Sequence, residues 1–256
     1  ANTTADNNTA VGFAALGANT TGTRNVALGA NALDANTVGD KNVALGMDAL
    51  GTNIDGSRSV AVGDSALAAQ EPASAVDMYN TAVGHGAGSA VTTGIQNTLI
   101  GGTAGDAITT GNYNVAVGGG ALTALTTGSE NTAIGISAMV GSTTCSNNVA
   151  VGGQALQSCT TGTSNVAVGH NALDANTTAS NNTAVGKDAL GANTTGSSNS
   201  AVGLNSLLGN TTGANNTAVG RSALQANVTG SSNTAVGYNA LPVCTTDGNT
   251  AVGKDA

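Results

Sequence analysis

Few residues of this chain are of the types that carry out chemistry. The two histidines, His85 and His170, stand at the same point of a repeated phrase, where other copies have Phe13 or Lys187. A position that accepts such different side chains is typical of an exposed turn, and no second histidine lies near either one to share a metal ion. The acidic residues are scattered over different points of the phrase, so they form no row of carboxylates for calcium. We therefore expect no catalytic residue, no metal site and no cofactor, and hence no enzyme.

The three cysteines offer thiol chemistry. Cys145 and Cys159 fall in adjacent copies of the phrase, so a disulfide between stacked turns is geometrically possible in an oxidising environment. Cys244 lies five copies further on, out of reach within the chain. The alternative is three small buried or loop thiols.

A second modification signal is the Asn-x-Ser/Thr acceptor of N-linked sugars, which recurs in one turn of the phrase. Sugars there would coat that turn in rows, but the repeat also generates such acceptors by chance. The candidate glycosylation sites are Asn19, Asn176, Asn193, Asn210 and Asn227.

The phrase is Asn-Thr/Val-Ala-Val-Gly-x-x-Ala-Leu, and it recurs every 17 residues. It begins at Asn8, Asn25 and Asn42, resumes at Asn80 after a four-residue insertion, and continues in step to Asn233. A fixed short period means that each copy is one structural unit stacked on its neighbours. The positions of each copy are numbered from its asparagine, which makes the glycine present in all fifteen copies position 5.

The period predicts the fold. Seventeen residues are too few for the two helices of a helical repeat, and Gly, Asn and Thr are poor helix formers. The length suits one coil of a parallel β-solenoid (a β-roll), with two or three short strands joined by Gly and Asn corners. About fifteen coils, each about 4.8 Å from the next, would form a rod of roughly 70 Å.

Equivalent residues of stacked coils form ladders. A glycine this regular indicates a positive φ or a close backbone approach, and stacked asparagines form an amide ladder whose side chains bond to the copies on either side. The residues that represent these two ladders are Asn8, Gly12, Asn25, Gly29, Asn165, Gly169, Asn233 and Gly237.

The first strand of each coil, at positions 1 to 5, is apolar on both faces. Val or Thr at position 2 and Val at position 4 share one face, while Ala at position 3 takes the other. Strands that are apolar on both sides are normally covered on both sides. The coil interior can cover one face. The other face needs either the opposite wall of the coil or a second chain, and a homotrimer satisfies this requirement best.

The phrase at Asn165 to Leu173, Asn-Val-Ala-Val-Gly-x-x-Ala-Leu, resembles the head repeats of YadA-like trimeric autotransporter adhesins. Related arrays occur in bacteriophage tail-fibre proteins. The resemblance covers residues 8–256 and implies a left-handed parallel β-roll in which three chains pack around an axis. The usual period of that family is shorter, so the extra residues here lengthen the Asn-Thr-Thr-Gly turn.

Composition limits the interior and the partners. Only 2% of the residues are aromatic, so the core must be thin. The formal net charge is -8 and only six Lys and Arg are present, which argues against nucleic-acid binding. No run of about 18 apolar residues occurs, so we expect no membrane insertion in this segment.

One solenoid array is expected over residues 1–256, with an irregular insertion loop at 68–79. Behind this loop, glycine replaces the usual leucine at Gly88 and Gly105, and Val91 and Ile108 supply apolar bulk three positions later. We predict a protruding loop over a locally repacked core. The loop is either a binding loop or a neutral insertion.

The chain begins and ends in the middle of a coil. Ala1 falls in the back half of a coil and Ala256 in the front half of another. One interpretation is a fragment of a longer array. The other is that subunits stack head to tail into filaments, because each open end is a sheet edge.

These features predict a non-enzymatic, extracellular structural or adhesive protein at the cell surface, as a fibre, filament subunit or adhesin head. Its partners would be copies of itself and a host, matrix or glycan surface, which repeated weak contacts bind multivalently. The first alternative is the shaft or receptor-binding region of a bacteriophage tail fibre, on the virion. The second is an ice-binding protein, because threonines at positions 13 and 14 stack on successive coils, with one of each pair able to face outward. Those pairs include Thr20-Thr21, Thr177-Thr178, Thr194-Thr195 and Thr211-Thr212.

Overall fold

A computed structural model describes residues 4–256 as an all-β chain. The described residues contain fifteen strands of three residues each and no helix, so none of them forms a helix that could cross a lipid bilayer. The chain divides into two compact units, residues 1–130 and 131–256. The end-to-end joint expected between Ala1 and Ala256 involves a residue outside the described range.

Each coil contributes one strand, at positions 2 to 4 of the phrase. The strands of the first unit are β1 (Thr9–Val11), β2 (Val26–Leu28), β3 (Val43–Leu45), β4 (Val60–Val62), β5 (Thr81–Val83), β6 (Thr98–Ile100) and β7 (Val115–Val117). Those of the second unit are β8 (Thr132–Ile134), β9 (Val149–Val151), β10 (Val166–Val168), β11 (Thr183–Val185), β12 (Ser200–Val202), β13 (Thr217–Val219), β14 (Thr234–Val236) and β15 (Thr250–Val252).

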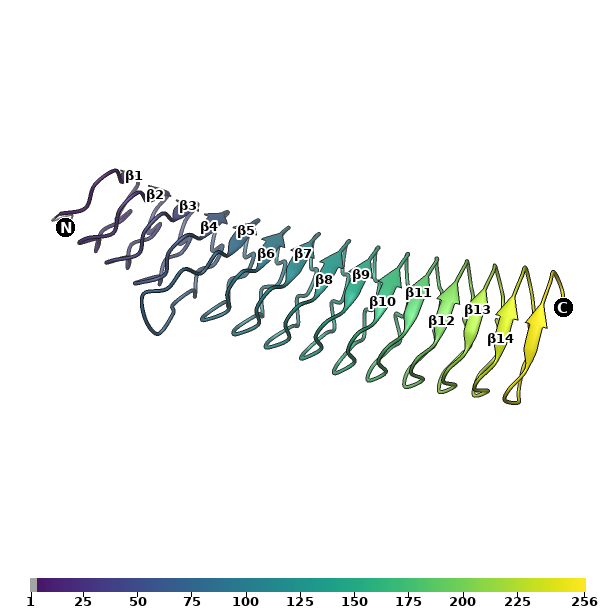
Figure 1. The fold of residues 1–256 in the computed structure, drawn as a ribbon. Helices are drawn as coiled ribbons and strands as arrows, with labels where there is room; N and C mark the ends of the chain where they lie inside the picture. Colours follow the sequence, from purple (N-terminus) through teal and green to yellow (C-terminus); the bar gives the residue numbers. More distant parts are fainter. Residues whose placement is uncertain (1–3) are drawn as a thin grey trace. The chain divides into compact units, whose positions relative to one another are not determined.

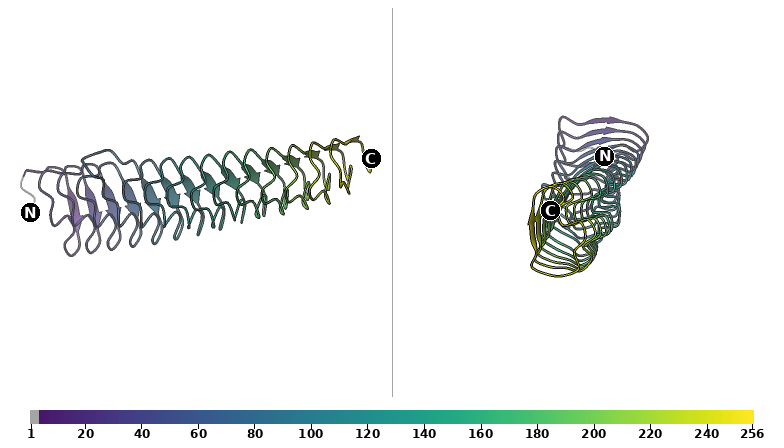
Figure 2. Two further views of the ribbon diagram at one scale, coloured as in Figure 1. Left: turned by 90° about the horizontal axis from the view of Figure 1, so that it is seen from below. Right: turned by 90° about the vertical axis from the view of Figure 1, so that its right-hand side faces the viewer.

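Within each unit, every strand pairs in parallel with the next, and the register places identical positions opposite one another. Ala167 of β10, for example, lies opposite Ala184 of β11. The Val166 N–H donates to the Asn182 carbonyl over 2.8 Å, and the Gly186 N–H donates to the Val168 carbonyl over 2.8 Å. Figure 2 shows the successive coils of each unit stacked turn upon turn. The predicted parallel β-solenoid with 17-residue coils is therefore confirmed.

The expectation of two or three strands in each coil is wrong, because the remainder of the coil is turn. Positions 7 and 9 hold left-handed residues, as at Asn171 (φ 55°) and Leu173 (φ 53°), and such residues cannot continue a strand. These turns are still bonded between coils, since the Leu173 N–H donates to the Ala189 carbonyl over 3.0 Å. Each coil thus combines one strand with stacked turns.

The core of each coil has an aliphatic half and an amide half. Alanines at positions 3 and 8 and leucine at position 9, such as Ala167, Ala172 and Leu173, are completely buried. Asparagines at positions 1 and 12, such as Asn165 and Asn176, are equally buried. Asparagine was expected at the outer bends. It lies inside because its amide supplies hydrogen bonds to turn backbone that cannot pair within a strand.

The insertion protrudes, as predicted. Residues 73–77 are exposed, and Figure 1 shows the segment between β4 and β5 extending beyond the turns of neighbouring coils. The stack is maintained before the loop, where the Glu71 N–H donates to the Thr92 carbonyl over 3.1 Å. It resumes after the loop, where Asp77 bridges to Ser57.

The core behind the insertion is repacked, also as predicted. Gly88 has φ +59°, like the leucines it replaces. A Cβ on Gly88 would lie 2.6 Å from Leu99 Cδ1 and 3.3 Å from Val91 Cγ2, so these side chains occupy the space of the usual leucine. Leu99 stands where other coils have alanine at position 3.

Candidate functional site

Glycine at position 5 ends each strand and sets the distance between coils. Gly186 has φ +139°, a conformation that L side chains rarely adopt. A Cβ there would lie 2.5 Å from the carbonyl oxygen of Gly203 in the next coil. Both reasons expected for a regular glycine, positive φ and close backbone approach, therefore hold. The same conformation recurs at Gly12, Gly29, Gly169 and Gly237.

Asparagine at position 1 connects three coils. In Asn199, Oδ1 accepts a hydrogen bond from the Asn216 N–H over 2.9 Å, and Nδ2 donates to the Gly213 carbonyl over 2.8 Å. The Asn199 N–H itself donates to Asn182 Oδ1 over 2.9 Å. Asn199 thereby satisfies the backbone of the next coil and of its own corner.

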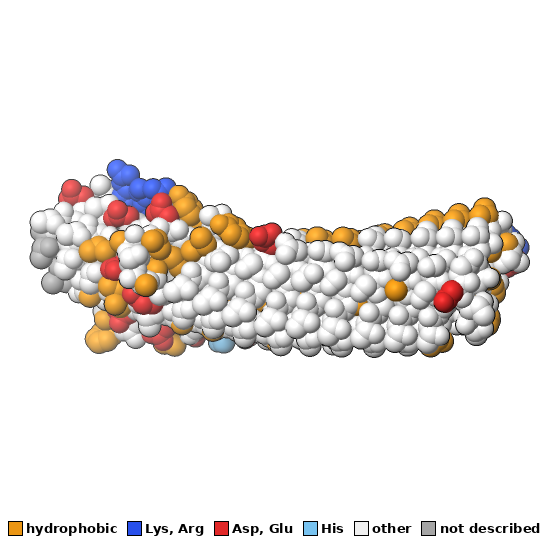
Figure 3. Space-filling view, turned by 60° about the horizontal axis from the view of Figure 1, so that its bottom comes forward, with side chains coloured by type: hydrophobic (Ala, Val, Ile, Leu, Met, Phe, Trp, Pro, Cys, Tyr) orange, Lys and Arg blue, Asp and Glu red, His pale blue; other side chains and the backbone are white. Residues whose placement is uncertain are grey.

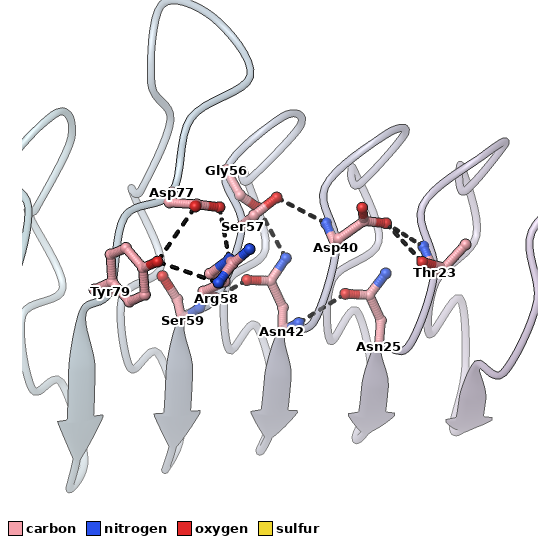
Figure 4. A network of polar contacts seen from close by, with 10 residues as sticks. All are labelled: Thr23, Asn25, Asp40, Asn42, Gly56, Ser57, Arg58, Ser59, Asp77 and Tyr79. Carbon is pink, nitrogen blue, oxygen red and sulfur yellow. Dashed lines mark hydrogen bonds and ion pairs between the residues drawn. The ribbon is translucent and has the colours of Figure 1, made fainter.

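The backbone N–H to Oδ1 contact recurs between other asparagines of this ladder. Asn25 donates its N–H to Asn8 Oδ1, and the Asn233 N–H donates to Asn216 Oδ1 (2.8 and 2.9 Å). Figure 4 shows the same contact from Asn42 to Asn25 and from Ser59 to Asn42. The expected link between amides is the weaker part of the ladder. In Asn165, for example, Nδ2 lies 3.2 Å from Asn148 Oδ1 but 2.9 Å from the Ala179 carbonyl.

A second asparagine ladder, at position 12, was not recognised from the sequence. Asn193 Nδ2 donates to Asn176 Oδ1 over 3.1 Å and to the Gly196 carbonyl over 2.9 Å. The available signal was a glycine three residues after these asparagines, at the corner that their amides bind. The five candidate glycosylation sites are all at this position and are buried, at 0–2% exposure: Asn19, Asn176, Asn193, Asn210 and Asn227. A glycan attaches through Nδ2, which here is enclosed and bonded, so glycosylation at these five residues is incompatible with the folded coil.

The outer surface of the strands carries an aliphatic residue at position 4 and Thr, Val or Ser at position 2. Alanine at position 3 faces the interior, so positions 2 and 4 face outward. In the second unit, Val185, Val202, Val219 and Val236 are 37–40% exposed. No charged residue occurs at either position in any coil. We call position 4 of strands β8–β15, which is Val or Ile throughout, the valine face; Figure 3 shows a row of hydrophobic side chains along the edge of the C-terminal part. The opposite wall of the coil covers only the alanine side and leaves the valine face open.

The two threonine positions have different roles. At position 13 the hydroxyl is used within the stack, since Thr194 Oγ1 donates to the Thr211 carbonyl over 3.1 Å. At position 14 the side chains are exposed. Within residues 4–256, their hydroxyls form no hydrogen bond in four successive coils, which we call the threonine row: Thr161, Thr178, Thr195 and Thr212.

Basic residues gather at position 17 of the first unit. Arg24, Lys41 and Arg58 follow one another on successive coils and are exposed, at the N-terminal side in Figure 3. Arg58 Nε lies 2.8 Å from Asp77 Oδ1, and its guanidinium lies 5.5 Å from the Tyr79 ring centroid (Figure 4). Both partners of this ion pair are about 40% exposed, so it contributes at most about 1 kcal/mol.

The remaining titratable groups do not converge on a site. Burial raises the pKa of the Asp106 and Asp174 carboxyls, and the neighbouring Asp188 raises that of Asp174 further. His85 and His170 are exposed on separate coils. Among residues 4–256, no three metal-ligating side chains lie close enough together to hold an ion.

The cysteines are free thiols. Cys145 and Cys159 are completely buried in adjacent coils of the second unit, and Cys244 is buried apart from them. Contact with the Cys159 thiol lowers the pKa of Cys145, whereas the same contact together with burial raises the pKa of Cys159. The two sulfur atoms that the sequence placed in adjacent turns therefore meet.

Comparison with protein families, curated proteins and solved structures gives no match to this chain. The YadA-like family named from the repeated phrase therefore remains a prediction. The described residues enclose no pocket. What the geometry offers instead is a set of repeated surfaces: the valine face, the threonine row and the exposed basic residues at position 17.

Proposed function

We propose that this chain is a non-enzymatic, extracellular structural or adhesive protein that works as part of a cell-surface fibre, filament or adhesin head. The observation that carries the proposal is the valine face, a row of Val and Ile side chains repeated on every coil of the second unit. The β-solenoid would give the fibre its mechanical strength. Its coils are joined by backbone hydrogen bonds and by two buried amide ladders, which resist both extension and proteolysis.

The partner of the valine face would be another copy of the same chain. Branched aliphatic side chains on adjacent strands form a flat surface, and burying it releases about 25 cal/mol for each Å² of apolar area. The absence of charge at positions 2 and 4 lets identical faces approach without repulsion. Three chains around an axis, as the family resemblance implies, would cover the valine face of each chain. Head-to-tail stacking of subunits would extend such an assembly into a filament.

Adhesion would use the surfaces that assembly leaves free. The turns and the loop at residues 73–77 are exposed and would present repeated contacts to a host, matrix or glycan surface. The same exposed turns would suit the shaft or receptor-binding region of a bacteriophage tail fibre, which is the alternative structural role.

Self-association through the valine face predicts a concentration-dependent oligomer that Val202→Glu weakens at least about tenfold, because the new carboxylate would be buried unpaired in the interface. Val202 is 40% exposed in the single chain, so the variant is expected to fold. Light scattering coupled to size-exclusion chromatography measures the oligomer mass over a range of concentrations.

The matched control is Thr195→Glu, which adds the same charge in the threonine row and should leave the oligomer unchanged. A parent chain that stays monomeric at every concentration would overturn self-association through this face. So would equal weakening by both variants.

Ice binding is the second candidate function, and the threonine row favours it. Four unbonded hydroxyls on successive coils are spaced by the strand separation of about 4.8 Å, close to an oxygen repeat of the ice lattice. β-branching restricts each threonine to few rotamers, so the row is preorganised.

This candidate predicts thermal hysteresis in the parent protein, measured as the gap between the melting and freezing points of a single ice crystal. Thr195→Tyr should abolish the hysteresis by interrupting the row, whereas Val202→Glu, on the strand surface, should preserve it. A parent protein without hysteresis excludes ice binding.

A further inference from the structure

We propose that Cys145 and Cys159 form an oxidation site, at which an intrachain disulfide cross-links two adjacent coils of the second unit. Cys145 is position 15 of the coil that begins at Asn131, and Cys159 is position 12 of the next coil. Most coils have glycine at position 15, and seven have asparagine at position 12. The proposal does not depend on the function proposed above.

The backbone of the coil directs these two side chains toward each other. A Cβ on Gly196, at position 15 of another coil, would lie closest to the Gly213 carbonyl oxygen of the next coil, and 2.7 Å from Asn193 Oδ1 and 3.0 Å from Asn210 Nδ2. A side chain at position 15 therefore points between the position-12 residues of its own coil and of the next. In the coil of Cys145, those two residues are Ser142 and Cys159.

Three substitutions meet at this point and compensate one another in volume. Cys145 adds a side chain where glycine is usual, and the two neighbouring position-12 residues, Ser142 and Cys159, are smaller than the asparagine found there in seven other coils. All three residues are completely buried. Cys145 Sγ lies 3.6 Å from the Cys159 carbonyl oxygen, and Cys159 Sγ lies 3.4 Å from the Gly162 carbonyl oxygen. The two thiols thus share one small interior space in place of the amide ladder.

The oxidant would be a low-molecular-weight disulfide such as oxidised glutathione. The Cys145 thiolate attacks one sulfur of the oxidant, which forms a mixed disulfide and releases one thiol molecule. The Cys159 thiolate then attacks Cys145 Sγ, which forms the intrachain disulfide and releases the second thiol. The two cysteines lose two protons and two electrons, and the oxidant takes up both.

Access to the thiols requires the turn to open. Thr143 and Thr144 are exposed beside the buried Cys145, so opening this turn would let the oxidant reach the two sulfur atoms from solvent. Oxidation should be slow in the folded chain and fast when the chain refolds in the presence of the oxidant. Once formed, the disulfide closes a loop of about 15 residues, which favours the folded state on the order of a hundredfold.

The experiment refolds the full chain in a glutathione buffer, blocks the remaining thiols and maps the peptides by mass spectrometry. The expected result is a peptide pair joined through Cys145 and Cys159, with Cys244 blocked. Chemical denaturation should then give a higher unfolding midpoint for the oxidised chain than for the same chain in reductant. Other coils of the chain show which residues can replace the two cysteines in control variants. Cys145→Gly and Cys159→Asn restore what other coils have, so both variants should fold and lose the difference between the two midpoints.

Cys244→Ser should retain that difference, because Cys244 lies outside the pair. The proposal is overturned if Cys145 and Cys159 are both blocked after refolding in the oxidant, or if either one is found joined to Cys244. Equal midpoints for the oxidised and reduced chain would overturn the cross-linking role even if the disulfide formed.

Discussion

The Gly186→Ala variant is expected to lose about 3–5 kcal/mol of the unfolding free energy of the second unit. Alanine would have to adopt φ +139°, which costs about 1–3 kcal/mol by itself. Its Cβ would also lie 2.5 Å from the Gly203 carbonyl oxygen. The partner is backbone and cannot rotate away, so the two coils must separate and weaken the hydrogen bonds between β11 and β12. Chemical denaturation followed by circular dichroism measures the loss.

The matched control is Gly153→Ala, at position 6 of another coil of the same unit. The nearest atom to a Cβ there is His170 Cδ2, at 3.4 Å, and Gly153 has no positive φ. Its unfolding free energy should stay within about 0.5 kcal/mol of the parent. Comparable losses in the two variants would show that position 5 does not set the approach of the coils.

The Asn199→Ala variant is expected to lose about 2–4 kcal/mol of unfolding free energy. The substitution removes the acceptor of the Asn216 N–H and the donor to the Gly213 carbonyl. Both partners lie in the interior, and each buried polar group left without a partner costs about 1–3 kcal/mol. Hydrogen exchange should show faster exchange of the Asn216 amide than in the parent, in addition to the lower unfolding midpoint.

Thr195→Ala is the control for this variant, because it also truncates a polar side chain to alanine. The Thr195 side chain is exposed and forms no hydrogen bond within the described residues, so the change should stay within about 0.5 kcal/mol. An Asn199→Ala variant as stable as this control would mean that the amide ladder contributes nothing to the stack.

Gly186 and Asn199 both hold the stacked coils together. A coil of 17 residues with a single short strand leaves most of its backbone in turns, where regular strand pairing cannot satisfy it. Glycine at position 5 permits close stacking, and asparagines at positions 1 and 12 bind the turn backbone. The repeated surfaces proposed to mediate assembly depend on this internal scaffold, because the spacing of the valine face follows from the spacing of the coils.

The candidate glycosylation sites show that an acceptor motif does not reveal whether its asparagine is buried. Asn176 and Asn193 fit the glycosylation acceptor because threonine follows two residues later, yet the structure uses their amides in the core. A local motif carries no information on which side of a turn faces solvent. The small residue that follows three positions later, Ala179 after Asn176 and Gly196 after Asn193, was the better indication of an internal amide.

The sequence by itself determined the period, the stacking of one coil for each period, the parallel strands and the glycine at the close approach. These follow from spacing, because a residue that recurs every 17 positions must meet its own copies when the coils stack. Only the tertiary structure decided that each coil has one strand, that alanine rather than valine faces inward, that both asparagine ladders are internal, and that position 14 is the outward threonine. Those outcomes depend on the left-handed turns at positions 7 and 9, which set the path of the coil and hence the side on which each residue emerges.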